Sequence, residues 1–181
     1  MTTIFDVNAG CPFENRSIIL DTNVWIFING FDPRPEVRPY SNFYSEALKK
    51  QNEFVVTDQV LSEYFNLACR MEYRLSHPKD QAMRDFKKVR KTADFLDRME
   101  SVRDTCLNMV EENKFICTSV SEDHYCKRIE EAAEGLMDLT DISIRESCHS
   151  LNGVLVTDDG DYADCGLAVV TGNKWLLKKR A

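Results

Sequence analysis

Two hydrophobic patterns alternate along this chain: short runs of apolar residues, and longer segments in which apolar residues return every three or four positions. Short apolar runs bounded by polar residues are typical of buried β-strands. Such runs occur at residues 17–20 (SIIL), 53–57 (EFVVT), 114–118 (KFICT), 154–157 (VLVT) and 167–171 (LAVVT). The pattern therefore predicts a sheet of about five strands.

The segments with three- and four-residue spacing predict helices. They lie at residues 42–51, 58–74, 122–135 and 139–151. Thr57 or Asp58 is suited to cap the second of these helices. A further helical block runs from residue 81 to 113, and its spacing fits either one long helix or a pair of helices broken near residues 92–94.

Strands that alternate with helices in this way indicate an α/β fold, with a central parallel sheet that is flanked by helices on both faces. The chain has 181 residues, of which 43% are hydrophobic and 29% charged, and this length and composition suit one well-packed domain. We therefore expect a single domain over residues 1–181, with an N-terminal extension at 1–16 and the helical block at 81–113.

The formal net charge of −7 argues against a protein that holds nucleic acid by overall electrostatic attraction. A polyanionic partner requires a bound cation or a local basic patch instead. Four basic residues surround Val89 at residues 87–91 (KKVRK). They form either a phosphate-binding face or the solvated side of an amphipathic helix, and the solvated side is the commoner arrangement.

No segment near the N-terminus combines basic residues with an apolar core, and no apolar run approaches the roughly 18 residues of a membrane span. The seven cysteines form no CxxC pair, as expected of reduced thiols in a cytoplasm. Cys117, in the predicted strand at 114–118, is expected to pack as a small core residue. We expect a cytoplasmic protein that does not contact a membrane.

Acidic residues stand where the predicted strands end. Asp21 directly follows the first strand, Glu63 lies in the first turns of the helix after the second, and Asp141 lies in the first turn of the helix that leads to the fourth. The fourth strand is itself followed by Asp158, Asp159 and Asp161. Because the carboxyl ends of parallel strands share one edge of a sheet, we expect these carboxylates to meet there.

Carboxylates brought together raise one another's pKa unless a divalent cation neutralises them. Oxygen ligands without His or Cys suit hard cations such as Mg²⁺ or Mn²⁺. Because side chains alternate along an extended chain, Asp158 and Asp159 are expected to point in opposite directions, and only one of them to face the site. Asp138 competes with Asp141 for a place in the site, but a position near the helix N-terminus explains it better.

The segments that carry these acids resemble the motifs of the PIN-domain nucleases, most closely those of the VapC type. ILDTNVWI resembles the first motif of that family, with Asp21, and TDQVLSEYFNLA resembles the helix that bears its second acid, Glu63. DISIRESCHSLNGVLVTDDGDY resembles the third and fourth motifs joined, with Asp141 at its start and Asp159 two residues after Thr157. The helical block at 81–113 matches least.

This resemblance implies a PIN-like fold and a metal-dependent endoribonuclease, in which Mg²⁺ or Mn²⁺ activates water to hydrolyse RNA phosphodiester bonds. The ions lower the pKa of bound water and stabilise charge on the phosphate, so the protein need supply only ligands and a groove. The implied ligands are Asp21, Glu63, Asp141 and Asp159, with Asp161 as a further metal ligand. Residues that would orient these ligands or bound water are Thr22, Asn23 and Thr157.

Resemblance to the VapC type also suggests a homodimer and a small antitoxin protein as partner, as in the toxin of a toxin–antitoxin pair. Two other classes of function fit less well. A HAD-type phosphotransferase needs a second Asp two residues after the first, where this chain has Asn23. A non-catalytic PIN-like module that binds RNA or protein is the remaining alternative, although such a module gains nothing from four clustered carboxylates.

Overall fold

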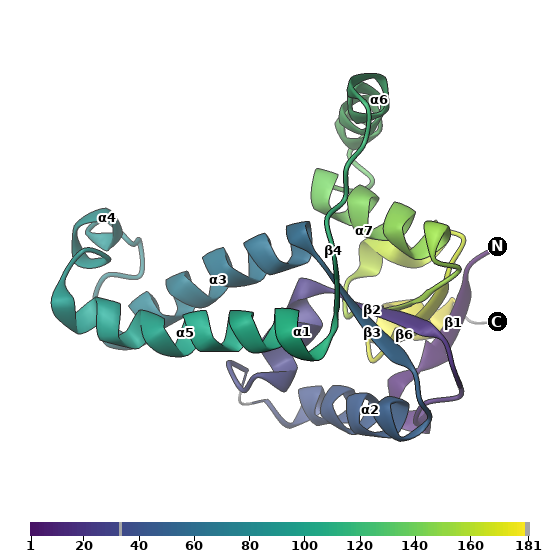
Figure 1. Cartoon of the computed structure of the whole chain (residues 1–181), viewed down its shortest axis with the longest axis horizontal. Coiled ribbons are helices and arrows are strands. Elements are labelled where there is room, and N and C mark those ends of the chain that lie inside the picture. The colour runs from purple at the N-terminus through teal and green to yellow at the C-terminus, as the bar shows by residue number, and fades with distance from the viewer. Residues whose placement is uncertain (33, 180–181) are drawn as a thin grey trace.

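In the computed structural model, which describes residues 1–32 and 34–179, six parallel strands form one central sheet (Figure 1). The strands are β1 (Thr3–Asp6), β2 (Ser17–Leu20), β3 (Glu53–Thr57), β4 (Lys114–Ile116), β5 (Val154–Val156) and β6 (Ala168–Thr171). Their order in the sheet is β1-β6-β5-β2-β3-β4. The five predicted strands correspond to β2–β6, and β1 adds a sixth within the segment expected to be an extension.

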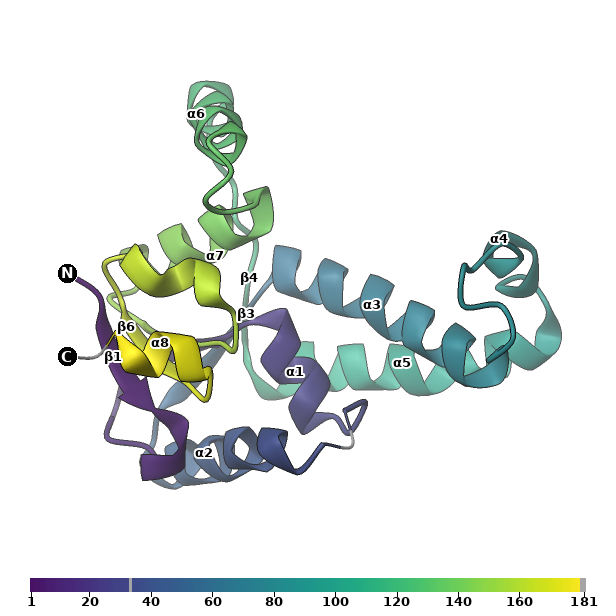
Figure 2. The same ribbon diagram turned by 180° about the vertical axis from the view of Figure 1, so that it is seen from behind.

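Eight α-helices surround the sheet in the same part of the chain. They are α1 (Thr22–Ile28), α2 (Arg38–Lys49), α3 (Asp58–Ser76), α4 (Phe86–Val89), α5 (Ala93–Glu112), α6 (Glu122–Ala133), α7 (Leu139–Ser150) and α8 (Lys174–Lys178). Helix α7 contacts β2 and β5, and α2 lies on the opposite side of the sheet (Figures 1 and 2). The predicted α/β fold with helices on both faces is therefore confirmed.

The helical block is a pair of helices, the short α4 and the long α5. Of the two predicted arrangements, the pair of helices is therefore the one observed, and Thr92 precedes the second helix. Thr57 is the cap of α3, because its hydroxyl accepts a hydrogen bond from the amide of Val60 at 3.2 Å. Helices α1 and α8 occupy segments for which the apolar pattern predicts no helix. Short 3-10 turns lie at Val7–Ala9, Pro35–Val37 and Gly160–Asp164.

The central strands account for the uninterrupted apolar runs of the sequence. Ile18, Ile19 and Leu155 of β2 and β5 are completely buried, because helices cover both faces of the sheet. The edge strand β4 is different. It ends at Ile116, and the expectation that Cys117 packs in the core is wrong, since that side chain is exposed beyond the end of the strand.

Helices α3 and α5 pack along each other and extend away from the sheet, with α4 at their far end; we call these three helices the arm (Figures 1 and 2). Helix α3 begins directly after β3 and so connects the edge of the sheet to the far end of the arm. Among the helices that the structure describes, none has the length and apolar character needed to cross a lipid bilayer.

Candidate active site

The carboxyl ends of β2 and β5 bring Asp21 and Thr157 side by side. The two strands are parallel neighbours with Leu20 opposite Val156, so the residue that follows each strand lies next to the other. The Thr157 hydroxyl donates a 2.6 Å hydrogen bond to Oδ2 of Asp21. The residues that follow these two strands are therefore in direct contact at one edge of the sheet, where the sequence predicts that strand ends lie.

Asp21 is buried, with 5% of its surface exposed, and it caps α1. Its Oδ1 accepts a hydrogen bond from the amide of Thr22 at 2.6 Å, and its Oδ2 accepts one from the Asn23 side-chain amide at 2.7 Å. Burial raises the pKa of Asp21 to about 7 against the lowering effect of its hydrogen bonds from Thr157 and Thr22, and the charges of Asp141 and Glu63 raise it further. Such a carboxylate needs positive charge nearby in order to ionise fully at neutral pH.

Glu63 reaches the same edge from the second turn of α3. Its Oε2 accepts a 2.8 Å hydrogen bond from the hydroxyl of Thr22, the residue next to Asp21. The side chain of Glu63 remains exposed to solvent, so the bond leaves it accessible from outside. Thr22 thus joins the acid of α3 to the acid at the end of β2.

Asp141 and Asp138 form a capping box at the start of α7. Asp138 is the N-cap, and its Oδ1 accepts from the amide of Asp141 at 2.9 Å, while Oδ2 of Asp141 accepts from the amide of Asp138 at 3.3 Å. The explanation of Asp138 as a residue of the helix N-terminus is therefore correct. Burial raises the pKa of Asp141 to about 6; the Tyr162 hydroxyl, which donates to Oδ1 at 2.8 Å, opposes this, and the charges of Asp138 and Asp159 add to it.

The three aspartates after β5 have different surroundings. Oδ1 of Asp158 accepts a 2.6 Å hydrogen bond from the hydroxyl of Tyr40, on α2. Asp159 caps the 3-10 turn Gly160–Asp164 by accepting from the amide of Asp161 at 3.0 Å, and its own amide donates to the Thr157 hydroxyl at 2.9 Å. Asp158 is thus bonded to α2 through its side chain and to Asn23 through its backbone amide, whereas the backbone amide of Asp159 bonds the residue that bonds Asp21. Which of the two side chains faces a metal stays a prediction.

The charges at this edge form a connected set. The charge of Asp159 raises the pKa of both Asp141 and Asp161, and that of Asp141 raises the pKa of Asp21. For Asp161 burial is the first cause, and the charges of Asp159 and Asp138 add to it. All these side chains offer only oxygen atoms, which are the ligands that hard divalent cations prefer, so the donor set fits such a cation by its chemistry.

The side chains as they stand bond to their neighbours rather than to one common point. In the part of the chain that the structure describes, no three His, Cys, Asp or Glu side chains are placed so that they could share one ion. The oxygens of Glu63 and Asp141 are instead engaged by Thr22, Asp138 and Tyr162.

Two open depressions adjoin the acidic edge on either side of Thr140, in the first turn of α7. One, of about 590 Å³, is lined by residues that include Asp138 and Asp161. The other, of about 430 Å³, is lined by the first turns of α3, including Gln59 and Glu63. Both depressions adjoin residues of the acidic edge, and Thr140 lines both of them.

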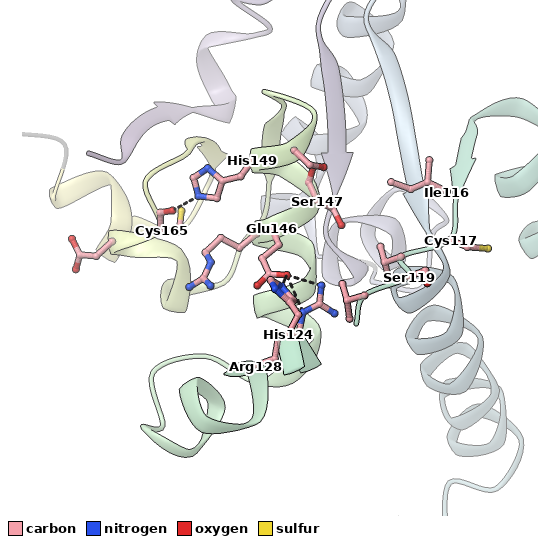
Figure 3. Close-up of a pocket in the computed structure, with 14 residues that line it drawn as sticks. Ile116, Cys117, Ser119, His124, Arg128, Glu146, Ser147, His149 and Cys165 are labelled. Carbon is pink, nitrogen blue, oxygen red and sulfur yellow. Dashed lines mark hydrogen bonds and ion pairs between the residues drawn. The ribbon is translucent and has the colours of Figure 1, made fainter. Parts of the chain in front are cut away.

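A separate cavity of about 690 Å³ lies between α6, α7 and the segment after β4 (Figure 3). Its charged groups already pair with one another: Arg128 and His124 both bond Oε2 of Glu146, at 2.6 Å and 2.9 Å. Arg145, which also lines it, pairs with Glu131. None of the four predicted ligand acids lines this cavity, so the candidate chemistry stays at the sheet edge.

Two tyrosines that bond acids of this region do not follow from the motifs. Tyr162 bonds Asp141, and Tyr40 bonds Asp158 while accepting from the amide of Gly172 at 2.7 Å. Both rings are buried, so in the sequence they read as ordinary core residues. The only available signal is that a buried Tyr hydroxyl requires a polar partner, which its sequence position does not identify.

Comparison with known proteins identifies a family and a similar fold. The sequence matches the family model of the PIN domain over residues 18–166, a range that contains every acid described at the sheet edge. The fold is similar to that in a crystal structure of VapBC2 from Rickettsia felis bound to a DNA fragment from their promoter. The TM-score is 0.51, with 19% sequence identity over 86% of this chain and 98% of that chain, so the likeness is one of fold. No curated protein matches the sequence.

Proposed function

The chain belongs to the PIN domain family, whose members are generally nucleases, and we propose that it is an endoribonuclease that hydrolyses RNA phosphodiester bonds with Mg²⁺ or Mn²⁺. The acids proposed to hold the metal are Asp21, Glu63, Asp141 and Asp159, with Asp161 as a further ligand. The bound ion would lower the pKa of a water molecule and stabilise charge on the phosphate.

The observation that carries this proposal is the burial of Asp21 among other acids. Its pKa of about 7 results first from burial and then, beyond its own hydrogen bonds, from the charges of Asp141 and Glu63. Gathering these carboxylates without a counter-charge costs free energy, because each disfavours ionisation of the others. A divalent cation would remove that cost and let a chain of net charge −7 accept a phosphate.

The remaining side chains of the site are assigned to holding the ligands in place. Thr157 and Asn23 fix the orientation of the Asp21 carboxylate through Oδ2, and Thr22 holds Glu63. Tyr162 fixes the orientation of Asp141. Partners that orient metal ligands in this way commonly account for a factor of about 10 to 100 in metal affinity or activity.

A non-catalytic PIN-like module that binds RNA or protein is the alternative. The geometry favours the enzyme, because a binding surface does not require a buried carboxylate whose ionisation is opposed by its neighbours. Exposed basic and aromatic side chains would serve a binding module better.

The biological setting belongs to the proposal as well. The similar crystal structure holds VapBC2 with promoter DNA, and this supports a role as the toxin of a toxin–antitoxin pair with a small antitoxin partner. We further propose a homodimer that acts on RNA in the cytoplasm.

The test is cleavage of end-labelled RNA by the purified chain with Mn²⁺, with Mg²⁺ and with a chelator. Asp21→Asn removes the charge and keeps the shape, and Asp158→Asn is the matched control because Asp158 bonds Tyr40 instead. We expect metal-dependent cleavage by the wild type and the control, and loss of cleavage in Asp21→Asn. Wild-type chain that neither cleaves RNA nor gains thermal stability with either metal would overturn the proposal.

A further inference from the structure

The charge of this chain is strongly segregated. Seven of its 23 lysines and arginines, but only two of its 30 aspartates and glutamates, lie between residues 74 and 92, which we call the arm tip. The arm tip therefore carries a formal charge of +5, and the rest of the chain carries −12. Within an acidic protein this is a local basic surface of the kind that a polyanionic partner requires.

The basic side chains of the arm tip are exposed and largely free of counter-charges. All seven are exposed to solvent. They are Arg74, Lys79, Arg84, Lys87, Lys88, Arg90 and Lys91. Among the residues that the structure describes, only Lys88 forms an ion pair, a 3.5 Å contact with Asp85 in which both side chains are mostly exposed. An ordinary solvated helix face intersperses both signs of charge, and this surface does not.

The second acid of the arm tip, Asp80, is bonded by groups of its own loop and of α3. Its Oδ2 accepts hydrogen bonds from the Tyr73 hydroxyl at 2.5 Å and from the amide of Asp85 at 3.0 Å, and its Oδ1 accepts from the amide of Arg84 at 3.1 Å. Asp80 therefore organises the backbone of the loop before α4, and among the described residues it forms no ion pair with a basic side chain.

An aromatic cluster holds the arm tip to the two long helices. The ring of Phe86, in α4, packs edge-on against Tyr73 of α3 and Phe95 of α5, with ring centres 5.3 Å and 6.2 Å apart. His77 stacks on Tyr73 at 4.7 Å. The basic side chains thus project from a packed frame, so the helices that carry them are held together before any partner binds.

The arm tip and the acidic edge lie at different places on one rigid element. Glu63 and Ser76 are both on α3, and at a rise of about 1.5 Å per residue they are roughly 20 Å apart along the helix. Figure 2 shows α3 leading from the sheet to α4 at the end of the arm. One extended polyanion is able to contact both places at once.

We propose that the arm tip is a second contact for the RNA substrate, which binds its phosphate backbone at a distance from the point of cleavage. This inference rests on the proposed nuclease function. The rest of the chain carries a net charge of −12 and on balance repels RNA, so the arm tip supplies an attraction that the acidic body lacks. Contacts of this kind position the substrate and carry no sequence information.

The test is the affinity of a labelled single-stranded RNA, measured by fluorescence anisotropy with a chelator present so that no cleavage occurs. The variant Lys87→Gln/Lys88→Gln/Arg90→Gln/Lys91→Gln removes four charges and keeps residues that favour helix. We expect affinity at low salt to fall at least about tenfold. The slope of log affinity against log salt should become shallower by about 3, because each phosphate that the protein no longer neutralises reduces the slope by about 0.7.

Two control variants distinguish the loss of charge at the arm tip from a change of fold and from a general loss of positive charge. Lys87→Arg/Lys88→Arg/Lys91→Arg keeps the charge and should bind RNA like the wild type. Arg38→Gln/Lys49→Gln removes two exposed charges from α2 and should leave the salt slope unchanged. With metal present, the four-Gln variant should cleave a dinucleotide at the wild-type rate but show a raised KM for long RNA with kcat unchanged.

Wild-type affinity and salt slope in the four-Gln variant would overturn the inference. A loss of RNA binding that accompanies a change of oligomeric state, measured by chromatography with light scattering, would also overturn it, because the arm tip would then be a protein–protein contact. Failure of the wild type to cleave any RNA counts against the nuclease alone, since the binding measurement is made without metal.

Discussion

The hydroxyl of Tyr162 donates a 2.8 Å hydrogen bond to Oδ1 of Asp141 and thereby joins the turn after β5 to the first turn of α7. Tyr162 is completely buried and Asp141 is partly buried, so the bond joins a core residue to an acid at the surface of the site. A donor aimed at a carboxylate favours its ionised form, and here it opposes the burial that raises the pKa of Asp141 to about 6.

Replacement of Tyr162 by Phe keeps the ring and removes the hydroxyl. We expect Tyr162→Phe to bind Mn²⁺ about tenfold more weakly in calorimetry, because an acid without its orienting donor is a poorer ligand. The acidic limb of the pH–activity profile should move to higher pH, since the pKa of Asp141 rises when the hydrogen bond is removed. Unchanged metal affinity together with an unchanged pH profile would show that the bond serves packing alone.

The three aspartates after β5 should differ in their effect on activity. Asp159→Asn is expected to lose most metal-dependent cleavage, because it removes the charge of a proposed metal ligand, and that charge also raises the pKa of Asp141. Asp161→Asn should lose part of the activity and shift the preference between Mg²⁺ and Mn²⁺. Asp158→Asn should be nearly silent, since Asn can still accept the hydrogen bond from Tyr40.

Parallel cleavage assays with both metals test this order. An active Asp159→Asn beside an inactive Asp158→Asn would place the metal ligand one residue earlier in the chain.

The metal-free protein should lose stability as pH rises. The pKa of Asp21 is about 7 in the folded chain against an ordinary value of 3.8, so the folded state holds this proton more tightly than the unfolded state. The loss of folding stability that comes from ionising Asp21 is absent below the ordinary pKa of 3.8. It grows by up to about 1.4 kcal/mol per pH unit between the ordinary and the folded pKa, and it is complete above about pH 7. Asp141 adds a smaller effect of the same sign.

Urea unfolding with a chelator, at about pH 5 and about pH 8, measures this cost. We expect the wild type to be less stable at the higher pH by an amount on the order of a few kcal/mol, and Asp21→Asn to lose less of its stability. Mn²⁺ should restore the wild type at the higher pH and leave the variant little changed. Equal pH dependence in both chains would contradict the raised pKa of Asp21.

The ion pair between α6 and α7 should contribute measurably to stability. Arg128 is buried with 4% of its surface exposed, and its Nη2 lies 2.6 Å from Oε2 of Glu146. Arg128→Met leaves Glu146, among the described residues, with His124 as its one hydrogen-bonded partner, and is expected to lower the free energy of unfolding by about 2 kcal/mol. The control is Lys114→Met, which breaks an exposed pair with Glu53 and should cost less than about 1 kcal/mol.

The sequence predicts those strands and helices whose buried residues form a recognisable pattern of apolar positions along the chain. The residues of β5 are all buried, so this strand appears as an unbroken apolar run, and α3 buries one face at regular intervals. β1 is a four-residue edge strand with one buried side chain, and α1 has seven residues of which most are apolar. Neither is long enough to show a period, so both depend on tertiary packing for their identification.

In the site, too, some features can be predicted from local sequence, whereas others depend on tertiary packing. Parallel strand ends bring Asp21 beside Thr157, and this placement requires no knowledge of side-chain orientation. The expectation that only one of Asp158 and Asp159 faces the site rests on the alternation of side chains along the chain. The bonds from Tyr40 and Tyr162 depend on how α2 and the turn after β5 pack, and local sequence does not encode that. The assignment of metal ligands itself stays a prediction.

The hydrogen bonds around Asp21 have a further meaning. The Thr22 amide, the Asn23 amide and the Thr157 hydroxyl all donate to its carboxylate, at 2.6 Å, 2.7 Å and 2.6 Å. These donors stand where water molecules would stand around a carboxylate in solution, and the turn after β2 and the end of β5 hold them in place. The protein thus provides Asp21 with a fixed solvation shell for its negative charge, and a cation that arrives there finds an anion whose surroundings need not reorganise.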